Sequence, residues 1–261
     1  MLAEDYLTAW HGRHANAARV FAGMHDDAGL VSYERLAALV TADHVVLDIA
    51  CGAGELLARL PHAASAGFRV GIDISDSELT LGSTRLPSVG FTRGRAQALP
   101  FADGCIDVAL CHMALMLMDD PDLVLAECRR VLRPGGVFAA ITNRLTALDA
   151  VAALVVGALR GALREGDISR RPPTIGDART QGAAPLAALV SSYFADVTVE
   201  PFAVSQLVPR EALWSFMVQS IYGLDAVADE VGAGILAGLD LPEQVLWTVP
   251  MVQVRGLVPA A

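Results

Sequence analysis

The amino-acid sequence predicts an α/β fold, a doubly wound, Rossmann-like parallel sheet with helices on both faces. Three observations indicate this class. Between residues 44 and 143, short β-branched runs alternate with helical windows, which is the arrangement of βαβ units. The first of these runs, VVLDI, leads directly into a glycine-containing turn. A length of 261 residues is sufficient for one large α/β domain.

Composition and charge exclude several classes of function. A formal net charge of −10 argues against a nucleic-acid-binding surface, which needs a basic patch. All 19 basic residues are arginine, so the chain has no lysine for a P-loop or a Schiff base. The 4 cysteines lack CxxC spacing, which disfavours structural zinc and suits a reducing cytoplasm. We therefore expect a cytoplasmic protein without a membrane segment, whose high apolar fraction of 54% suits a homodimer.

Residues 1–43 are predicted to form helices that cap the sheet. Apolar residues and one histidine recur at three- and four-residue spacing on one face: Leu7, Trp10, His14, Ala17 and Phe21. On such a face His14 is either a packed core residue or a functional group. If the segment covers a pocket, Tyr6, His11 and His14 are the first polar groups available to a substrate.

The next hundred residues are predicted to alternate between strand and helix. We expect strands at residues 45–49, 68–72, 89–92, 106–111 and 137–142. Helical windows lie near residues 54–60, 76–86 and 120–132. Right-handed crossovers between parallel strands would place these helices on both faces of the sheet.

The last part of the chain is predicted to complete the sheet and to cover it. A helical run extends from residue 143 to 164 and precedes a polar loop at 165–184. A helix at 185–193 leads into a strand at 197–204, and a last strand spans 251–257. The helical stretch at 210–246 is expected to be a lid over the carboxyl edge of the sheet. We therefore predict a single domain, 1–261, with a helical cap (1–43), a cofactor-binding core (44–143) and a completing part (144–261).

The stretch at residues 45–57 predicts a site for an anionic or zwitterionic ligand. A strand, a glycine turn and a helix N-terminus together present backbone N–H groups and positive potential to a ligand. A dinucleotide fingerprint would need a small third residue, but the bulky Leu57 occupies that position. Asp48 also precedes the turn, where dinucleotide-binding proteins are usually apolar. NAD binding is therefore disfavoured.

Several short motifs follow one another in order along the chain. Residues 47–54 are LDIACGAG, which fits LDxGxGxG with Ala50 in the first glycine position. They are followed by GIDIS at 71–75, ALPFAD at 98–103, IDVALC at 106–111 and LRPGG at 132–136. In this order and spacing the motifs resemble the class I S-adenosylmethionine-dependent methyltransferases, in particular the small-molecule, UbiE-like (type 11) domain. The resemblance covers residues 35–143, with a looser echo at 194–204.

This resemblance implies seven strands with the last one antiparallel, S-adenosylmethionine as the cofactor, S-adenosylhomocysteine as the product, and no metal. It implies that Asp73 accepts hydrogen bonds from both ribose hydroxyls. The other cofactor-binding positions that it implies are Asp48, Ala50, Gly52, Gly54, Ile74, Ala96, Gln97, Leu99 and Cys111, the last through its carbonyl. Asp48 either contacts the cofactor or orients the turn. Arg95 departs from the family, which often has an acidic residue there to accept a hydrogen bond from the adenine amino group.

Candidate residues for the reaction follow the fourth and fifth strands and lie in the lid. His112 is the candidate general base, because its ordinary pKa suits proton transfer near neutral pH; the alternative is a hydrogen bond to a loop. Asn143 either contacts the methyl acceptor or caps a turn. Trp214 and Tyr222 are either core residues or walls for an aromatic acceptor.

The predicted function is methyl transfer from S-adenosylmethionine to a small molecule. Negative charge disfavours RNA or DNA as acceptors, and the apolar caps suit a hydrophobic or aromatic secondary metabolite, an indole-containing one or an antibiotic precursor among them. Met113, Met116 and Met118 either pack in the core or form an adaptable wall for it. The alternative function is a protein of the same fold that binds S-adenosylmethionine without transferring methyl, as a cyclase or scaffold.

Overall fold

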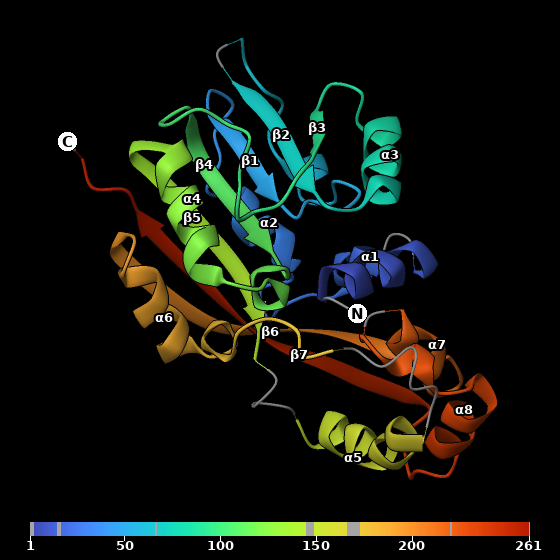
Figure 1. Cartoon of the computed structure of the whole chain (residues 1–261). Coiled ribbons are helices and arrows are strands. Elements are labelled where there is room, and N and C mark those ends of the chain that lie inside the picture. The colour runs from blue at the N-terminus through green and yellow to red at the C-terminus, as the bar shows by residue number, and fades with distance from the viewer. Residues whose placement is uncertain are drawn as a thin grey trace.

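The described part of the chain forms one seven-stranded sheet flanked by helices (Figure 1). The computed structural model describes residues 3–14, 17–65, 67–144, 149–165, 173–219 and 221–260. The strands are β1 Val45–Ile49, β2 Phe68–Asp73, β3 Gly90–Arg93, β4 Ile106–His112, β5 Leu132–Asn143, β6 Ala195–Pro209 and β7 Gln244–Leu257. Their order in the sheet is β3-β2-β1-β4-β5-β7-β6. β7 runs antiparallel to β5 and β6 and the other pairs are parallel, which confirms the predicted fold class.

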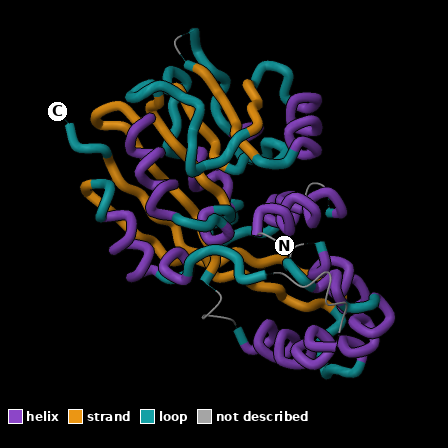
Figure 2. Tube along the Cα trace, in the orientation of Figure 1, coloured by secondary structure: helices purple, strands orange, loops and turns teal. Residues whose placement is uncertain are grey.

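Helices cover both faces of this sheet (Figure 2). The α-helices are α1 Ala3–Arg13, α2 Ser32–Ala37, α3 Asp76–Arg85, α4 Pro121–Val131, α5 Ala150–Glu165, α6 Ala183–Ser191, α7 Leu213–Val218 and α8 Asp229–Ala237. The short 3-10 helices are η1 Ala17–Gly23, η2 Leu57–Arg59, η3 Leu115–Leu117, η6 Ala178–Thr180, η7 Arg210–Ala212 and η8 Leu224–Ala226. No helix in the described ranges is long and apolar enough to span a bilayer.

Alternation along the central strands produces two cores, one on each face. In β1, Val46 packs with α2 and its neighbours, whereas Leu47 and Ile49 pack with α4 and α6. This is the period of two that a strand covered on both sides requires. The site-bearing turn after β1 is therefore anchored from both faces.

The helix predicted near residues 54–60 does not form. The chain instead makes consecutive turns and the single 3-10 turn η2. Gly52 and Gly54 have φ of +50° and +78°, which an α-helix does not allow, so regular helix cannot begin there. Leu60 is already extended because it precedes Pro61. The segment between Gly54 and Leu60 is therefore too short for a regular α-helix.

The two last strands are longer than predicted and form an extended ribbon. β6 and β7 pair continuously towards Pro209 and Gln244, so residues 244–246 are strand and not the end of a helical lid. The β-forming run VLWTV at 245–249 explains the extension, because it finds a partner strand in the residues before Pro209. The ribbon reaches beyond the parallel strands and carries α7 and α8 at its far end, with α5 beside them (Figure 1).

The N-terminal segment is helical, but its helices do not share one continuous face. α1 ends at Arg13, and Phe21 lies in the separate 3-10 helix η1. α1 lies between α3 and α7 (Figure 1). Tyr6, Leu7 and Trp10 form its buried cluster, which packs against Tyr222 of the lid region. Of the polar loop predicted at 165–184, residues 166–172 lie outside the described residues, and α6 begins before the loop was expected to end.

Candidate functional site

One cavity of about 690 Å³ opens at the carboxyl ends of the parallel strands, where α/β folds bind their ligands. Its walls come from β1, β2, β4, β5 and β7 and from helices α1 and α5. The structure brings together at this cavity most of the candidates that the sequence indicated: His11, Asp48, Ala50, Gly52, Asp73, Ile74, Ala96, Gln97, His112, Asn143 and Tyr222.

Three of the expected cofactor-binding residues do not line the cavity. Gly54 faces the end of α3 and the strand β3, because a Cβ there would lie 2.9 Å from Leu86 and 3.1 Å from Phe91. Leu99 and Cys111 are buried in the core that packs on α4 and α6. Burial raises the pKa of the Cys111 thiol to about 12. These three residues pack in the layer behind the cavity wall and do not face the cavity.

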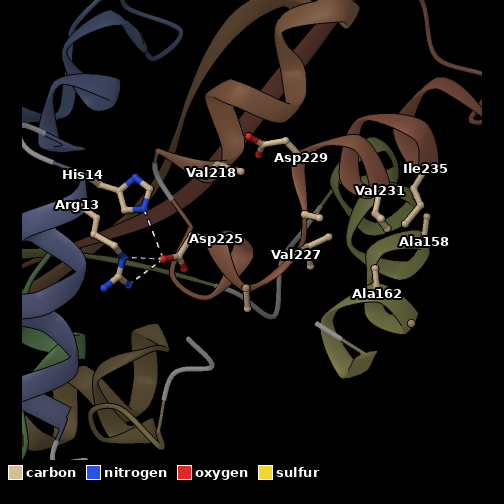
Figure 3. A pocket seen from close by; sticks show the side chains of 13 residues that line it. Arg13, His14, Ala158, Ala162, Val218, Asp225, Val227, Asp229, Val231 and Ile235 are labelled. Carbon is tan, nitrogen blue, oxygen red and sulfur yellow. Dashed lines mark hydrogen bonds and ion pairs between the residues drawn. The ribbon is translucent and has the colours of Figure 1, made fainter. Parts of the chain in front are cut away.

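Three of the expected substrate-binding residues also lie away from it. Tyr6 is buried in the α1 cluster. Trp214 donates its indole N–H to Asp229 Oδ1 at 2.8 Å and packs on Gly232, so it joins α7 to α8. His14 faces a different hollow, in which its Nε2 lies 3.6 Å from Asp225 Oδ2 (Figure 3).

That second hollow has a volume of about 1040 Å³ and lies between α1, α5 and the α7–α8 region (Figure 3). Arg13 at the end of α1 and His14 directly after it reach this hollow, and both approach Asp225. Ala158 and Ala162 of α5 form its opposite wall. The helix α5 therefore separates the two hollows and presents different faces to them.

The turn after β1 is held by the carboxylate that ends β2. Asp73 Oδ2 accepts a hydrogen bond from Gly52 N at 2.8 Å, and Oδ1 accepts one from Ser75 N at 2.9 Å. Ala50, with φ of +55°, is one of the few residues other than glycine in the left-handed region, a strained conformation for an L-residue. Strain of this kind persists only when the surroundings enforce it, and the hydrogen bond from Gly52 to Asp73 fixes the backbone two residues further on.

Two further carboxylates give this end of the cavity a negative character. Asp48 is buried, and within the described part of the chain its Oδ2 has no hydrogen-bond partner. Burial raises the pKa of Asp48, and the nearby Asp73 adds to the rise. Glu78, at the start of α3, is also buried and lies 3.8 Å from His11 Nδ1. An acid in the first turn of a helix is so common that the sequence held no signal for Glu78.

α1 and the lid region meet above these carboxylates. Tyr222 Oη and His11 Nε2 lie 3.3 Å apart, and the ring of Trp10 lies 4.5 Å from that of Tyr222. Burial lowers the pKa of His11 against the opposing effect of Asp73. This contact closes the cavity over the glycine turn.

Arg95 does not enter the cavity. Its guanidinium pairs at 2.7 Å with Glu4 of α1, so the residue that departs from the family pattern holds the cap in place. Gln97 donates from Nε2 to the Asp119 carbonyl at 2.7 Å, which leaves its Oε1 as an acceptor. Next to it the backbone at Gly94 approaches Ile72 closely, because a Cβ there would lie 2.7 Å from Ile72 Cδ1.

His112 occupies an aromatic pocket in the cavity wall. Its Nε2 lies 2.8 Å from Ser32 Oγ, and its ring stacks on Tyr33 at 3.9 Å between centroids. Burial, with a smaller contribution from Arg59, lowers the pKa of His112 to about 3. The imidazole is therefore neutral at physiological pH and accepts a proton only weakly.

The rest of the wall is apolar. Met113, Met116 and Met118 all line the cavity, as does Trp247 of β7. Trp247 was not identified from the sequence, because the stretch directly before it, residues 210–246, was expected to be helical. The β-branched and aromatic run at 245–249 is the strand signal that the sequence held.

Comparison with known proteins finds similarity in the central part of the chain. Residues 47–140 match the family described as a methyltransferase domain. Methyltransferase GfsG of Streptomyces halstedii is 37% identical over 133 residues, which are 48% of this chain and 47% of that protein. The UbiE C-methyltransferase of ubiquinone and menaquinone biosynthesis from Acidiphilium cryptum is 38% identical over 99 residues, 36% of this chain and 39% of that protein. These matches confirm the resemblance predicted for this region.

The similarity is strongest in the core and weaker elsewhere. The matched segments span less than half the length of these curated relatives. Over the whole chain, the fold is similar to that of the cyclase SpnF, with a TM-score of 0.60, 15% identity, and coverage of 100% of this chain and 98% of that one. At that identity the likeness concerns the fold alone.

Proposed function

We propose that this chain, whose residues 47–140 match the methyltransferase domain family, transfers a methyl group from S-adenosylmethionine to a small apolar molecule. The observation that carries this proposal is the buried carboxylate Asp48, whose Oδ2 lacks a partner among the described residues, beside the glycine turn. A buried carboxylate without a partner is costly, and a cationic ligand removes that cost. S-adenosylmethionine carries two positive charges, on its sulfonium and on its ammonium group.

The remaining residues around the turn suit the other parts of this cofactor. Asp73 has lone pairs left for the ribose hydroxyls, since each of its oxygens accepts one backbone hydrogen bond. Gln97 Oε1 and the backbone at Ala96 would receive the adenine, against Ile74. Positive φ at Gly52 lets the backbone approach the methionine end.

Alignment and exclusion of water are the contributions of the protein to methyl transfer. When bound, S-adenosylmethionine supplies an electrophilic methyl group, so the protein needs little covalent chemistry of its own. α1 and Tyr222 close the cavity above the turn through the His11 contact. His112 and Asn143 face the acceptor from the ends of β4 and β5. Their position would orient the acceptor atom in line with the methyl group.

The acceptor that this cavity suits is small, with an apolar or aromatic body. The three methionines provide a wall that adapts to irregular shapes, and Trp247 and Tyr222 provide flat surfaces. An aromatic secondary metabolite, including one with an indole ring, is within this class, and we propose that class for the acceptor.

The proposal is tested by following both products of the reaction. The purified protein is incubated with S-adenosylmethionine labelled in its methyl group and with small-molecule extracts of bacterial cultures. We expect label in an organic-soluble product and an equal amount of S-adenosylhomocysteine. The matched control is Gly52→Val, which should give neither product. If cofactor binds and neither product forms with any extract, the protein is instead one that binds the cofactor without transferring methyl.

His112 is expected to act at the acceptor without titrating. Because its pKa is about 3, turnover should show no inflection from this residue between pH 5 and 9. His112→Ala should lower turnover by about ten-fold or more, with cofactor affinity within two-fold of the wild type. Calorimetry and a pH–rate profile measure the two properties separately. A profile with an inflection near pH 6.5 that disappears in His112→Ala would instead identify a general base.

A further inference from the structure

The cavity carries opposite charges at its two ends. Asp48, Asp73 and Glu78 surround the glycine turn. At the other end, Arg144 follows β5, and Arg160 reaches the cavity from α5. Among the described residues that line the cavity, these two are the only arginines, and the chain has no lysine.

Neither guanidinium is used for the fold. Within the described ranges, Arg144 and Arg160 form no side-chain hydrogen bond or ion pair. Other arginines of the chain do have partners, as Arg13 has in Asp225 and Arg130 has in Glu127. Acidic residues are not scarce, since the chain has 29 of them for 19 arginines. Two arginines left without partners in one cavity are therefore available to a ligand.

The elements that carry these arginines are well anchored. The Arg144 backbone N–H donates to the Pro250 carbonyl at 2.8 Å, which joins the end of β5 to β7. On α5, Val156 and Arg160 are one turn apart and both line the cavity. Ala158 on the same helix faces the second hollow instead (Figure 3). Arg144 is half-buried and Arg160 is exposed, so the first lies deeper than the second.

We propose that Arg144 and Arg160 bind an anionic group, a carboxylate or a phosphate, at one end of an otherwise apolar methyl acceptor. This inference rests on the proposed function and specifies its acceptor class. Guanidinium groups bind carboxylate and phosphate oxygens with paired, charge-assisted hydrogen bonds. The apolar body of the acceptor lies along the methionines and Trp247.

The charge pattern also orients the acceptor. An anionic group is repelled by the carboxylates around the glycine turn and attracted to the β5–α5 end. The end of the acceptor that carries no charge is then the one that faces the methyl donor. An acceptor that is neutral throughout would give neither arginine a charged partner.

The test compares three ten-carbon compounds that differ only in their head group. Decanoate, decyl phosphate and decanol are titrated by calorimetry into the protein saturated with S-adenosylhomocysteine. We expect the wild type to bind at least one anionic chain roughly ten-fold or more tightly than decanol. Arg144→Gln should lose most of that preference. Arg160→Gln should lose about three-fold, because its guanidinium is exposed. The tighter of the two anions identifies the head group as carboxylate or phosphate.

Arg255→Gln is the matched control. Arg255 lies on β7, is exposed, does not line the cavity, and its removal changes the net charge by the same amount. The Arg255→Gln variant should bind all three compounds with the affinities of the wild type. Equal affinity of the wild type for decanol and both anions, or equal losses in Arg144→Gln and Arg255→Gln, would overturn the inference.

A separate titration with S-adenosylhomocysteine alone keeps the two proposals apart. If the wild type and all variants bind it while head-group preference is missing, the inference fails and the proposed function stands. If the wild type does not bind it, the proposed function itself fails, and the inference about its acceptor fails with it.

Discussion

Replacing Gly52 by valine is expected to abolish binding of S-adenosylmethionine. Gly52 has φ of +50°, which costs an L-residue roughly 1–2 kcal/mol and a β-branched residue at least that. A Cβ at this position would meet only Glu78 Oε2, at 3.8 Å, so the protein itself has room for it. The added atoms would instead fill the part of the cavity next to Glu78. Calorimetry with S-adenosylmethionine should therefore detect no binding, although the chain still folds.

Gly135→Val separates this effect from backbone strain. Gly135 has φ of +75° and nothing within 4 Å of its added Cβ, and it does not line the cavity. The two variants should lose similar thermal stability, and only Gly52→Val should lose the cofactor. Gly52→Ala provides a milder variant in case the valine prevents folding. Wild-type affinity in Gly52→Ala and Gly52→Val would place the cofactor elsewhere.

The Asp48→Asn substitution is expected to stabilise the protein and to weaken cofactor binding. The folded-state pKa of Asp48 is raised, mainly by burial. Between the unfolded pKa of about 3.9 and that raised value, the native state holds a proton that the unfolded state has released. The stability of the wild type therefore falls as pH rises through this window. Asparagine does not titrate, so this loss should be absent from the variant.

Melting temperatures and calorimetry measure these two effects. Asp48→Asn should melt higher than the wild type at pH 7, with a difference that shrinks as the pH approaches 4. At pH 7 its affinity for S-adenosylmethionine should fall about ten-fold or more, because a charge-assisted contact is lost. A variant that is less stable than the wild type at pH 7, or that binds the cofactor equally well, would contradict the assigned role.

Asp107→Asn is the contrasting control on the neighbouring strand. Asp107 accepts a hydrogen bond from Val45 N and pairs with Arg133, each at 2.6 Å, so its carboxylate is fully used by the fold. This substitution should lower the melting temperature and leave cofactor affinity unchanged. The opposite signs at two buried or partly buried carboxylates distinguish a binding group from a structural one.

The local pattern of apolar residues and glycines was sufficient to predict the parallel strands and the turn that follows β1. Val45–Ile49 was predicted with the correct bounds, because a strand buried on both faces is a continuous apolar run. The resemblance to methyltransferases implied that Asp48, Gly52 and Asp73 belong to one cofactor site, and the structure places all three at one cavity. Their placement depends on residues close to them in the chain.

Local pattern failed where the outcome depended on distant partners. Residues 244–250 become strand because the residues before Pro209 pair with them, and that pairing is not encoded in either segment alone. Trp214 and Tyr222 are both aromatic residues of the stretch that was expected to be helical. Trp214 packs against α8 inside the lid, whereas Tyr222 lines the cavity. The sequence of a helical stretch does not indicate which distant residues will pack against a single aromatic side chain.

The sequence by itself determined the fold class and the position of the glycine turn. These properties follow from hydrophobic period and from backbone requirements, which act over a few residues. Only the tertiary structure decided which groups lie opposite that turn. Glu78, Trp247, Arg144 and Arg160 come from four separate elements, and each looks ordinary in its own segment. Their meeting depends on how the β6–β7 ribbon and α5 pack over the sheet, because burial and charge at a site are set by residues distant in the chain.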